Sequence, residues 1–442
     1  MSKAPLAIFW FRRDLRLWDN AALWEALKLN SAVLPIFIFD RDILDQLVNK
    51  RDARVLFIHQ EVSRLKNELE KIGSSLKVLY GKPREVLEKL LDDYDVKSLF
   101  ANRDYEPYAQ NRDKEIYELL KTRGVDFKGF KDHVIFEKNE ILKDDKKPYT
   151  VFTPYANKWK KTVNDFYLKS YPSENYQKNF LRCQPFSLPE LSEMGFENFE
   201  FTFFPENKID LEVVSQYALN RDIPAIKGTS RLSLHLRFGT ASIRQVCRIA
   251  IIQSEKWLDE LIWRDFYQMI IYHFPHSAKK SFKAGYDNIS WNDDLEDFQK
   301  WCDGKTGYPI VDAGMRELNA TGFMHNRVRM IVASFLSKHL LIDWRWGEKY
   351  FAQKLLDYDL ASNVGGWQWV VGSGCDGAPY FRIFNPESQA ERFDPEKIYI
   401  KKWVLEYGSK DYCEPIVDHK LARIRCLESF KSGLEKQKRL AL

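Results

Sequence analysis

Residues 6–11, LAIFWF, form a short and unbroken apolar run of the kind that a fully buried β-strand needs. Four further apolar runs follow it along the chain: VLPIFIF (33–39), LKVLYG (76–81), SLFAN (98–102) and DHVIF (132–136). The segments between them carry apolar residues at helical spacing, over residues 20–27, 53–73, 83–94 and 111–124. Buried strands that alternate with helices predict a parallel sheet with helices on its faces. We therefore predict a Rossmann-like α/β domain with a parallel five-stranded sheet over residues 1–135.

The remainder of the chain has two different rhythms. Residues 136–205 lose their periodicity and are rich in Lys, Asn, Pro and aromatic residues, which predicts an interdomain linker lying over the surface. Residues 206–442 then carry helical periodicity almost throughout and predict an all-α domain. No G-x-G-x-x-G follows the first strand, so a ligand of the α/β domain must bind without the usual dinucleotide motif.

Composition excludes several classes of protein. The 442 residues are 45% hydrophobic and 30% charged, which indicates a globular chain without a disorder signature. The net charge of +5 is too small to establish a nucleic-acid partner, although a local basic patch is compatible with it. No apolar run of about 18 residues and no signal peptide are found, so we expect neither a membrane span nor secretion. Six scattered cysteines without a C-x-x-C pair argue against zinc and against disulfides, and we expect a reduced cytoplasmic protein with no metal.

A carboxylate lies within an aromatic stripe in WLDELIWRDFYQM (257–269). Glu260, Trp263 and Tyr267 share one helical face, which Trp257 extends by a turn. Burying such a carboxylate is costly unless it has a partner or is protonated. An exposed Glu beside core aromatic residues is the more common arrangement on this segment alone.

Small hydroxyl side chains cluster in IKGTSRLSLHLRFG (226–239). Thr229, Ser230 and Ser233 surround Arg231, and together with free backbone amides they could bind a phosphate. An ordinary helix N-cap is the alternative explanation.

A third stretch, GFMHNRVRM (322–330), places Asn326 and Met330 four residues apart, with Arg327 and Arg329 between them. Asn offers a donor and an acceptor, Met a soft apolar contact, and Arg a planar cation for a phosphate or a buried acid. The adjacent His325 is, as a lone His, more often structural than catalytic.

Acids and indoles follow one another in DYDLASNVGGWQWVVGSG (357–374). Asp357 and Asp359 could bind a metal, but nearby His and Cys ligands are missing, so balancing a buried Arg and accepting from a ligand fit them better. Trp367 and Trp369 flank a single Gln beside two glycines, which would let the backbone turn close to a ligand. Stacking on a flat ligand and plain core packing are both compatible with this pattern.

The order of these motifs resembles that of the photolyase/cryptochrome family over nearly the whole chain. The resemblance rests on FWFRRDLRLWDN (9–20), GTSRLSLHLRFG (228–239), ELIWRDFY (260–267), GKTGYPIVDAGMRELNATGFMHNRVRM (304–330), DYDLASNVGGWQW (357–369) and PYFRIFNP (379–386). It implies the photolyase/cryptochrome fold, in which an N-terminal α/β domain is joined to a helical domain that binds one non-covalent FAD. The chain is most similar to class I photolyases, which act on cyclobutane pyrimidine dimers in DNA.

The resemblance also implies roles for individual residues. Residues that would contact the dimer are Glu260, Trp263, Asn326, Met330 and Trp369. Residues that would bind FAD are Tyr217, Thr229, Ser230, Arg231, Leu232, Ser233, Trp257, Arg264, Arg329, Asp357, Asp359 and Asn363. Trp291, Trp344 and Trp367 would transfer electrons, Arg221 and Arg327 would reach the DNA backbone, and Glu106 would contact an antenna chromophore, either a folate or a deazaflavin.

The implied activity is light-dependent DNA repair, in which an electron from photoexcited reduced FAD splits a flipped-out dimer. Two alternatives are a blue-light receptor of the cryptochrome type and a (6-4) photolyase. Asn363, rather than the Asp of plant cryptochromes, favours repair, and so does the short stretch after the last motif. The (6-4) enzymes carry a catalytic His where this chain reads HNRVRM, so His325 bears on that alternative. We expect a monomer, because DNA docking needs a free face.

Overall fold

The structure, a computed structural model, describes residues 4–440 and contains two compact units. The first, called the α/β unit here, consists of the chain up to Glu140 together with Lys161–Ile209 and Arg231–Ile252. The second, called the helical unit, consists of Ile141–Lys160, Asp210–Ser230 and the chain from Gln253 onward.

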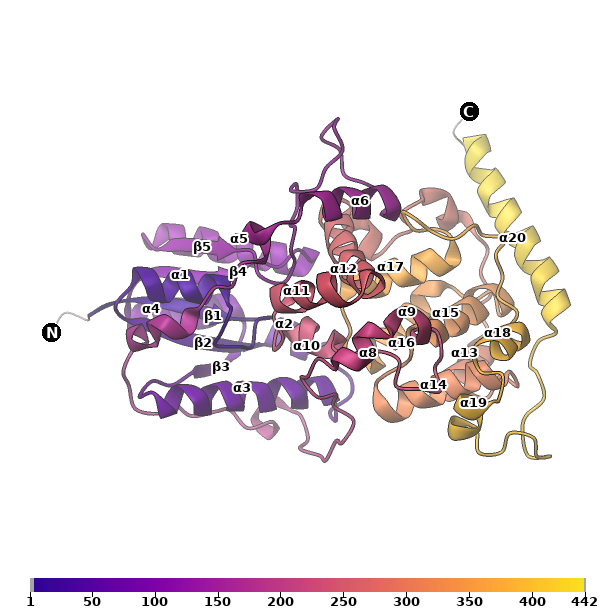
Figure 1. Ribbon diagram of the computed structural model, residues 1–442, viewed down its shortest axis with the longest axis horizontal. Helices are drawn as coiled ribbons and strands as arrows, with labels where there is room; N and C mark the ends of the chain where they lie inside the picture. The colour runs from indigo at the N-terminus through magenta and orange to yellow at the C-terminus, as the bar shows by residue number, and fades with distance from the viewer. Residues whose placement is uncertain (1–3, 441–442) are drawn as a thin grey trace. The chain divides into compact units, whose positions relative to one another are not determined.

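A five-stranded parallel sheet forms the centre of the α/β unit, in the order β3-β2-β1-β4-β5 (Figure 1). Its strands are β1 (Pro5–Phe11), β2 (Val33–Asp40), β3 (Lys77–Gly81), β4 (Asp95–Asn102) and β5 (Asp126–Phe130). The predicted fold class is confirmed, and LAIFWF is the central strand, with Phe9 aligned to Pro35 on one side and to Phe100 on the other. The chain reverses its direction of strand addition between β1 and β4, where open α/β sheets usually bind ligands.

The fifth strand was predicted at the wrong place. DHVIF (132–136) is an irregular segment, and the strand is formed by DFKGF (126–130) instead. Val134, Ile135 and Phe136 are buried as the run predicted, but burial of an apolar run does not require a strand. The carboxylate of Asp132 is held in a buried ionic cluster, which is described below.

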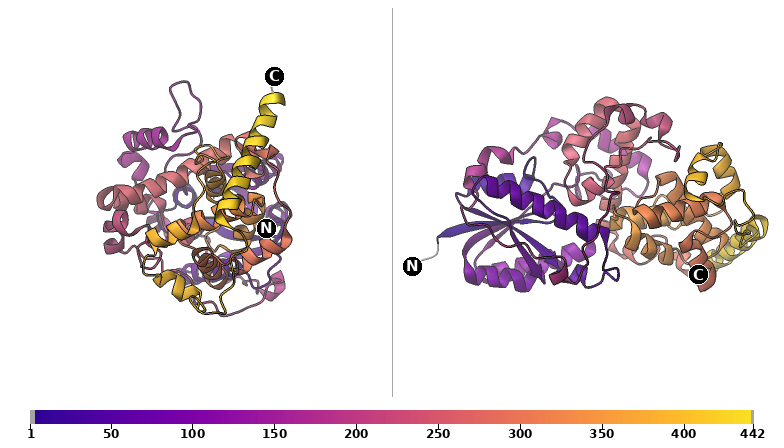
Figure 2. Two further views of the ribbon diagram at one scale, coloured as in Figure 1. Left: turned by 90° about the vertical axis from the view of Figure 1, so that its right-hand side faces the viewer. Right: turned by 90° about the horizontal axis from the view of Figure 1, so that it is seen from below.

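Helices cover both faces of the sheet (Figure 2). On one face, Leu87 and Leu90 of α4 and Ile116 of α5 pack against strand residues such as Ile8 and Ile36. The helices of the α/β unit are α1 (Ala21–Leu29), α2 (Arg41–Leu44), α3 (Ala53–Lys71), α4 (Pro83–Asp93), α5 (Pro107–Thr122), α7 (Asp165–Leu168), η1 (Ser173–Asn179), η2 (Ser192–Met194), α10 (Ser233–Phe238) and α11 (Ile243–Gln253). The regular alternation of strand and helix over residues 5–130 therefore follows the sequence pattern.

A buried ionic cluster holds α11 in the α/β unit. Arg244 donates to the carboxylates of Asp19 and Asp132, at 2.8 Å each, and Arg16 donates to Asp132 at 2.6 Å. All four side chains are at most 4% exposed. Because an unpaired charge is costly to bury, removal of any one of these arginines or aspartates would destabilise the fold.

The packing does not follow the limits predicted at residues 135 and 205. Of the predicted linker, Ile141–Lys160 packs with the helical unit and Lys161 onward packs with the α/β unit, where Leu181 donates its N–H to the carbonyl of Val33. Arg231–Ile252, which the sequence assigned to the helical domain, also packs with the α/β unit. The sequence predicted helices in this segment correctly, but helical periodicity does not specify which unit a helix packs against. The ion pairs of Arg244 attach this segment to the α/β unit.

The helical unit contains α6 (Phe152–Thr162), α8 (Leu211–Ser215), α9 (Tyr217–Asn220), α12 (Glu255–His273), η3 (Pro275–Ala278), η4 (Ala284–Asn288), α13 (Leu295–Asp303), α14 (Pro309–Thr321), α15 (Asn326–Ser334), η5 (Phe335–His339), α16 (Trp344–Lys354), α17 (Leu360–Val371), α18 (Pro386–Phe393), α19 (Ile398–Trp403) and α20 (His419–Leu440). Helix α17 packs against α12, α15 and α16 (Figure 1). Between residues 4 and 440, no helix combines the length and the apolar character that crossing a membrane requires.

The ionic cluster predicts how stability depends on pH. Burial alone would raise the pKa of Asp132, but Arg16 and Arg244 outweigh it and lower that pKa to about 2. Because the pKa in the unfolded chain is about 4, the cluster stabilises the fold above about pH 4, and this contribution is lost as the pH falls toward about 2. We expect the free energy of unfolding to decrease by about 2 kcal/mol over that range from this group, as measured by urea unfolding.

The Asp132→Asn variant is the control for this dependence. It is less stable at neutral pH by about 3–5 kcal/mol, because it leaves buried arginines without a counter-charge. Its stability should change less between about pH 4 and 2 than that of the wild type. An identical slope in both proteins would contradict the assignment to Asp132.

Candidate functional site

Helix α12 carries Glu260 and Trp263, which are both half-buried, on the face that the sequence predicted. Glu260 does not stand alone, because the Arg221 guanidinium, just after α9, donates to its Oε1. Burial raises the pKa of the Glu260 carboxyl, and Arg221 opposes that rise. The Arg221 guanidinium also lies 5.3 Å from the centre of the Tyr217 ring, and Tyr217 is buried. The predicted residues Tyr217, Arg221 and Glu260 therefore meet in one place.

The indole of Trp263 is covered on one face by Phe152, a residue that sequence reasoning missed. The two rings are parallel to within 3°, with centroids 3.7 Å apart. The backbone N–H of Phe152 donates to Asp376 Oδ2 at 3.1 Å, and α6 is also attached to α12 by the Trp159 indole, which donates to Asp265 Oδ2 at 3.0 Å. Because a ring has two faces, another flat group could stack only on the opposite face of Trp263.

A second arginine is paired on α15. Arg327 donates to Asp222 Oδ1 at 2.8 Å and lies 4.3 Å from the centre of the Phe393 ring. His325, whose role was open, caps this helix, since its Nδ1 accepts the N–H of Arg327 at 3.1 Å. Burial lowers the pKa of His325 to about 4, so the ring is neutral at physiological pH and serves the helix end. Asn326 stands exposed at the start of α15, with its Nδ2 4.0 Å from Met330 Sδ.

The two acids before α17 each have a partner. Asp357 accepts from Arg329 at 3.1 Å, so that pair balances its own charge. Asp359 caps α17 by accepting the N–H of Ser362, and it also accepts from Gln268 Nε2 at 3.1 Å. The expectation that the acids balance an Arg and accept N–H groups fits this geometry, although the partners are protein groups.

Asn363 has its amide oriented by Glu348, which the sequence did not single out. Asn363 Nδ2 donates to Glu348 Oε1 at 3.0 Å and to the Glu348 carbonyl at 3.2 Å. Burial raises the pKa of Glu348, while hydrogen bonds from Asn363 and Tyr358 oppose the rise. Since both donors of the amide point to Glu348, its Oδ1 is the atom that a ligand would meet, and that atom accepts a hydrogen bond.

Neither of the two glycines before the indoles bends the chain, and only Gly365 is closely packed. Helix α17 runs through both of them, so the expectation of a turn was wrong. A Cβ on Gly365 would lie 2.3 Å from the Tyr267 ring, whereas a Cβ on Gly366 would meet nothing within 4 Å. Behind Gly365, a cavity of about 20 Å³ between α12 and α17 has room for a water molecule and no ligand.

The Gln between the two indoles is a structural tie. Gln368 Oε1 accepts the N–H of Phe282, and its Nε2 donates to the carbonyl of Ser277 at 2.8 Å. Trp367 is buried on the other side of the helix and fills the space above Gly347, where a Cβ would lie 2.1 Å from the indole. Trp369 is half-buried and borders the core of the helical unit.

The three indoles predicted to transfer electrons lie on separate elements. Trp344 is buried at the start of α16, Trp367 lies 5.1 Å from Phe351, and Trp291 lies 5.7 Å from Phe430 of α20, centroid to centroid. Among the described residues, no ring pair joins two of these three indoles. Their role as a chain stays a prediction.

The remaining predicted residues lie on both units. Trp257 is buried and Arg264 half-buried on α12. Thr229 and Ser230 end a segment of the helical unit, and Arg231, Leu232 and Ser233 begin a segment of the α/β unit. Arg231 has a φ of 52°, an unfavourable conformation for a non-glycine residue, and Leu232 caps α10 without a side-chain bond, so the alternative of an ordinary side-chain N-cap is not supported.

These groups fit the dinucleotide that the resemblance implies. In the described part of the chain, the buried Trp367 Nε1 and Gln268 Oε1 have no hydrogen-bond partner. The position above Gly366 is open, and the Asn363 Oδ1 acceptor is preset. Hydroxyls at Thr229 and Ser230 offer the donors that phosphates need.

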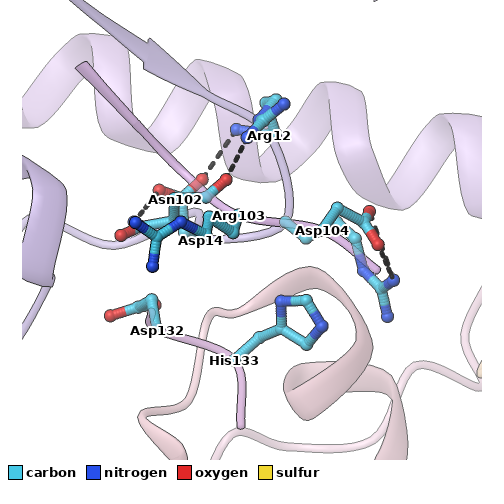
Figure 3. Close-up of a pocket in the computed structure, with 8 residues that line it drawn as sticks. Arg12, Asp14, Asn102, Arg103, Asp104, Asp132 and His133 are labelled. Atoms are coloured by element: carbon cyan, nitrogen blue, oxygen red, sulfur yellow. Dashed lines mark hydrogen bonds and ion pairs between the residues drawn. The ribbon is translucent and has the colours of Figure 1, made fainter. Parts of the chain in front are cut away.

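At the carboxyl ends of β1 and β4 the α/β unit has a small polar cavity of about 10 Å³ (Figure 3). Arg12 and Asp14 from the end of β1 meet Asn102 of β4 above Asp132 and His133. Glu106 lies nearby, paired with Arg13 at 3.0 Å and with Arg237 at 3.7 Å. The cavity has room for about one water molecule, and the antenna contact predicted for Glu106 stays a prediction.

The sequence did not predict the roles of Phe152, Asp222 and Glu348, and it indicates these three residues with different strength. Phe152 precedes Thr-Pro in a polar stretch, where an aromatic side chain is expected to pack against another apolar group. Asp222 directly follows Arg221, so an acid beside that cation could have been suspected, but nothing in the sequence indicated its bond to Arg327. Glu348 lies in GEKYFAQK and reads as an ordinary surface residue, so nothing in the sequence indicated it.

The two glycines of α17 form a matched pair of tests. We expect Gly365→Ala to destabilise the protein by about 1–3 kcal/mol, because the new methyl group overlaps the Tyr267 ring. Gly366→Ala, one residue away in the same helix, should stabilise it by up to about 1 kcal/mol through helix propensity. Chemical denaturation of both variants measures the difference, and equal effects would show that the close packing at Gly365 is not tight.

Comparison with known proteins agrees with this geometry. Residues 7–174 match the family model described as DNA photolyase, and residues 257–409 match that of the FAD binding domain of DNA photolyase. The chain is 36% identical to the deoxyribodipyrimidine photo-lyase of Salmonella typhimurium, over 97% of this chain and 99% of that one. It is 36% identical to that of Synechococcus sp., over 95% and 94%.

Solved structures give the same result. A bacterial class III photolyase from Agrobacterium tumefaciens superimposes with a TM-score of 0.86 at 32% identity, covering 98% of each chain. An archaeal photolyase from Sulfolobus tokodaii, described with two FAD molecules and a novel light-harvesting cofactor, has a TM-score of 0.80 at 34% identity, covering 97% of this chain and 100% of that one. A Synechocystis cryptochrome has a TM-score of 0.84 at 26% identity, covering 97% and 99%. The chain therefore belongs to the photolyase/cryptochrome family.

Proposed function

We propose that the protein is a light-dependent DNA-repair enzyme, a deoxyribodipyrimidine photo-lyase that uses FAD to split cyclobutane pyrimidine dimers. The observation that carries the proposal is the pairing of Glu260 with Arg221 beside the stacked indole of Trp263. An acid, a cation of the kind that binds phosphate and an aromatic surface thus lie together in one unit. The near full-length likeness to deoxyribodipyrimidine photo-lyases supports the same reaction.

Arg221 and Arg327 would bind the DNA backbone. Each guanidinium presents a planar set of donors that matches phosphate oxygens. Phosphate contacts position a protein on DNA and make its affinity depend on salt. With a net charge of only +5, the affinity must come from such localised contacts.

The dimer must leave the duplex to reach the site, at a cost of a few kcal/mol that is lower for a damaged base. Stacking on the face of Trp263 opposite Phe152 and on Trp369 would offset about 1–3 kcal/mol of this cost per base. Glu260 would hold a thymine carbonyl by hydrogen bonding, and Asn326 and Met330 would border the dimer. The protein's own part of the work is thus to extrude, stack and orient the lesion.

FAD would be held through its phosphates by Thr229, Ser230, Arg231, Leu232 and Ser233, and around its rings by Tyr217, Trp257, Arg264, Arg329, Asp357, Asp359 and Asn363. When reduced and excited by light, it supplies the electron that opens the dimer. Asn363, oriented by Glu348, would accept a hydrogen bond from the ring system through Oδ1. Trp291, Trp344 and Trp367 are proposed to connect the site with the surface, and an antenna chromophore near Glu106 is an optional addition.

We further propose that the enzyme acts as a monomer inside the cell. Its six cysteines are all free thiols, which is compatible with a reducing compartment.

The proposed function is tested by illumination of damaged DNA. The purified protein is loaded with FAD, reduced and mixed with ultraviolet-irradiated oligothymidylate, and recovery of thymine absorbance is followed in light and in darkness. Recovery only in light establishes the dimer lyase. Bound flavin without recovery refutes it; repair of a (6-4) lesion would then assign that substrate, and its absence would leave a receptor.

Replacing Glu260 should separate repair from cofactor binding. We expect Glu260→Ala to lower the repair yield about tenfold or more, because a hydrogen bond of a charged or acidic group to the dimer is lost. The flavin content should stay unchanged. Glu255→Ala, at the exposed start of the same helix, is the matched control and should repair normally. Equal losses in both variants would contradict the role of Glu260.

The stack on Trp263 predicts a further effect. Phe152→Ala should weaken binding of dimer-containing DNA several-fold, because an aromatic pair is worth about 0.5–1.5 kcal/mol and the indole loses its support. Binding of undamaged DNA should not change, because the phosphate contacts remain. Phe152→Tyr retains the ring and should restore the affinity; equal weakening for damaged and undamaged DNA would point to a general folding defect.

A further inference from the structure

Four charged side chains form one row across three elements of the helical unit. Glu260 on α12 accepts from Arg221, whose Nε lies 3.9 Å from Asp222 Oδ1. The same oxygen of Asp222 accepts from Arg327 on α15 at 2.8 Å. Negative and positive groups alternate along this row, and their formal charges cancel.

A phosphate that binds to Arg221 disturbs this balance of charge. A phosphate on Arg221 adds a third negative group to a cation that already serves Glu260 and Asp222. A guanidinium has five donors in a fixed plane, so it cannot turn fully toward a phosphate and keep its bond to Glu260 in the same geometry. Engaging DNA therefore weakens the pairing of Glu260.

The surroundings of Glu260 contain few other cations. From α9 it faces the ring of Tyr217, and on its own helix it faces Lys256, Asp259 and Tyr267. Asp222 lies beyond Arg221. Among the described residues, Arg221 and then Lys256 are the main cations that stabilise the ionised carboxyl, and burial opposes ionisation. A half-buried carboxylate that loses its main counter-ion becomes protonated more readily.

An ionised carboxylate has no proton to donate, and a thymine carbonyl has only lone pairs. Glu260 can thus hydrogen-bond a dimer carbonyl only after it gains a proton. DNA binding can cause this proton uptake, because the phosphate that arrives with the lesion also draws Arg221 away from Glu260.

We propose that Arg221 is a counter-ion switch that couples DNA-backbone binding to protonation of Glu260. Without DNA, Arg221 keeps Glu260 ionised; with a phosphate on Arg221, one proton moves from the solvent to a carboxyl oxygen of Glu260, which then donates to the lesion. No bond in the DNA is made or broken in this step, and the proton returns to solvent when the product leaves. The inference rests on the proposed function and names Arg221 as a positioning residue for the acid.

Proton uptake on binding tests the proposal directly. The flavin-loaded protein is titrated in darkness with a dimer-containing oligonucleotide by calorimetry, in buffers of different ionisation enthalpy at one near-neutral pH. We expect the wild type to take up about one proton per complex when Glu260 is ionised beforehand. Its Kd should rise about tenfold per pH unit between the free and bound pKa of the acid.

Four variants assign the proton. Glu260→Gln should bind without uptake and with a Kd that does not change with pH. Arg221→Met should also lose the uptake, because Glu260 is then protonated before DNA arrives, whereas Arg221→Lys keeps the cation and should keep the uptake. Asp222→Asn should retain it, which excludes Asp222 as the titrating group. Thermal unfolding and flavin content verify that each variant is folded, and the Glu260→Gln comparison decides the question if an Arg221 variant is not.

Two negative results have different meanings. If the wild type repairs dimers in light but takes up no proton, or if Glu260→Gln takes up as many protons as the wild type, the switch is overturned and the proposed function stands. If the wild type neither binds nor repairs dimers, the proposed function itself fails.

Discussion

Ion pairs between buried or half-buried side chains from distant segments of the chain constrain the packing of both units. In the α/β unit, Asp19 and Asp132 bring Arg16 and Arg244 together from distant parts of the chain. In the helical unit, Arg329 meets Asp357 and Arg221 meets Glu260. Because leaving one member unpaired would cost several kcal/mol at the most buried sites, each pair strongly constrains the position of two segments.

The constraint acts differently in the two units. In the α/β unit the ion pairs are fully enclosed and serve assembly, since they attach α11 to the loops beside the sheet. In the helical unit the pairs are only partly covered and remain accessible to exchange. An exchangeable pair can do chemistry, because replacing one partner changes the protonation of the other. The proposed function uses ion pairs that are incompletely buried.

Close packing around α17 completes the site. Gly365 admits the Tyr267 ring and Gly347 admits the Trp367 indole, so α17 comes near to α12 and α16. Gln368 ties the helix to the segment around Ser277. The indoles of Trp367 and Trp369 are therefore oriented by different contacts. Trp367 fills the space above Gly347, and Trp369 packs at the edge of the core.

The sequence by itself determined most of the secondary structure and the residue types of the candidate site. Unbroken apolar runs such as LAIFWF, and the helical spacing of Glu260, Trp263 and Tyr267, are local properties, and local sterics and burial express them directly. Only the tertiary structure decided partners: Phe152 for Trp263, Glu348 for Asn363, Asp222 for Arg327, and the sheet unit for residues 231–252. The fifth strand, predicted at 132–136, lies at 126–130 in the structure. Periodicity specifies which face of an element is buried and not what it is buried against, because partners far apart in sequence are selected by charge matching and by the space between side chains.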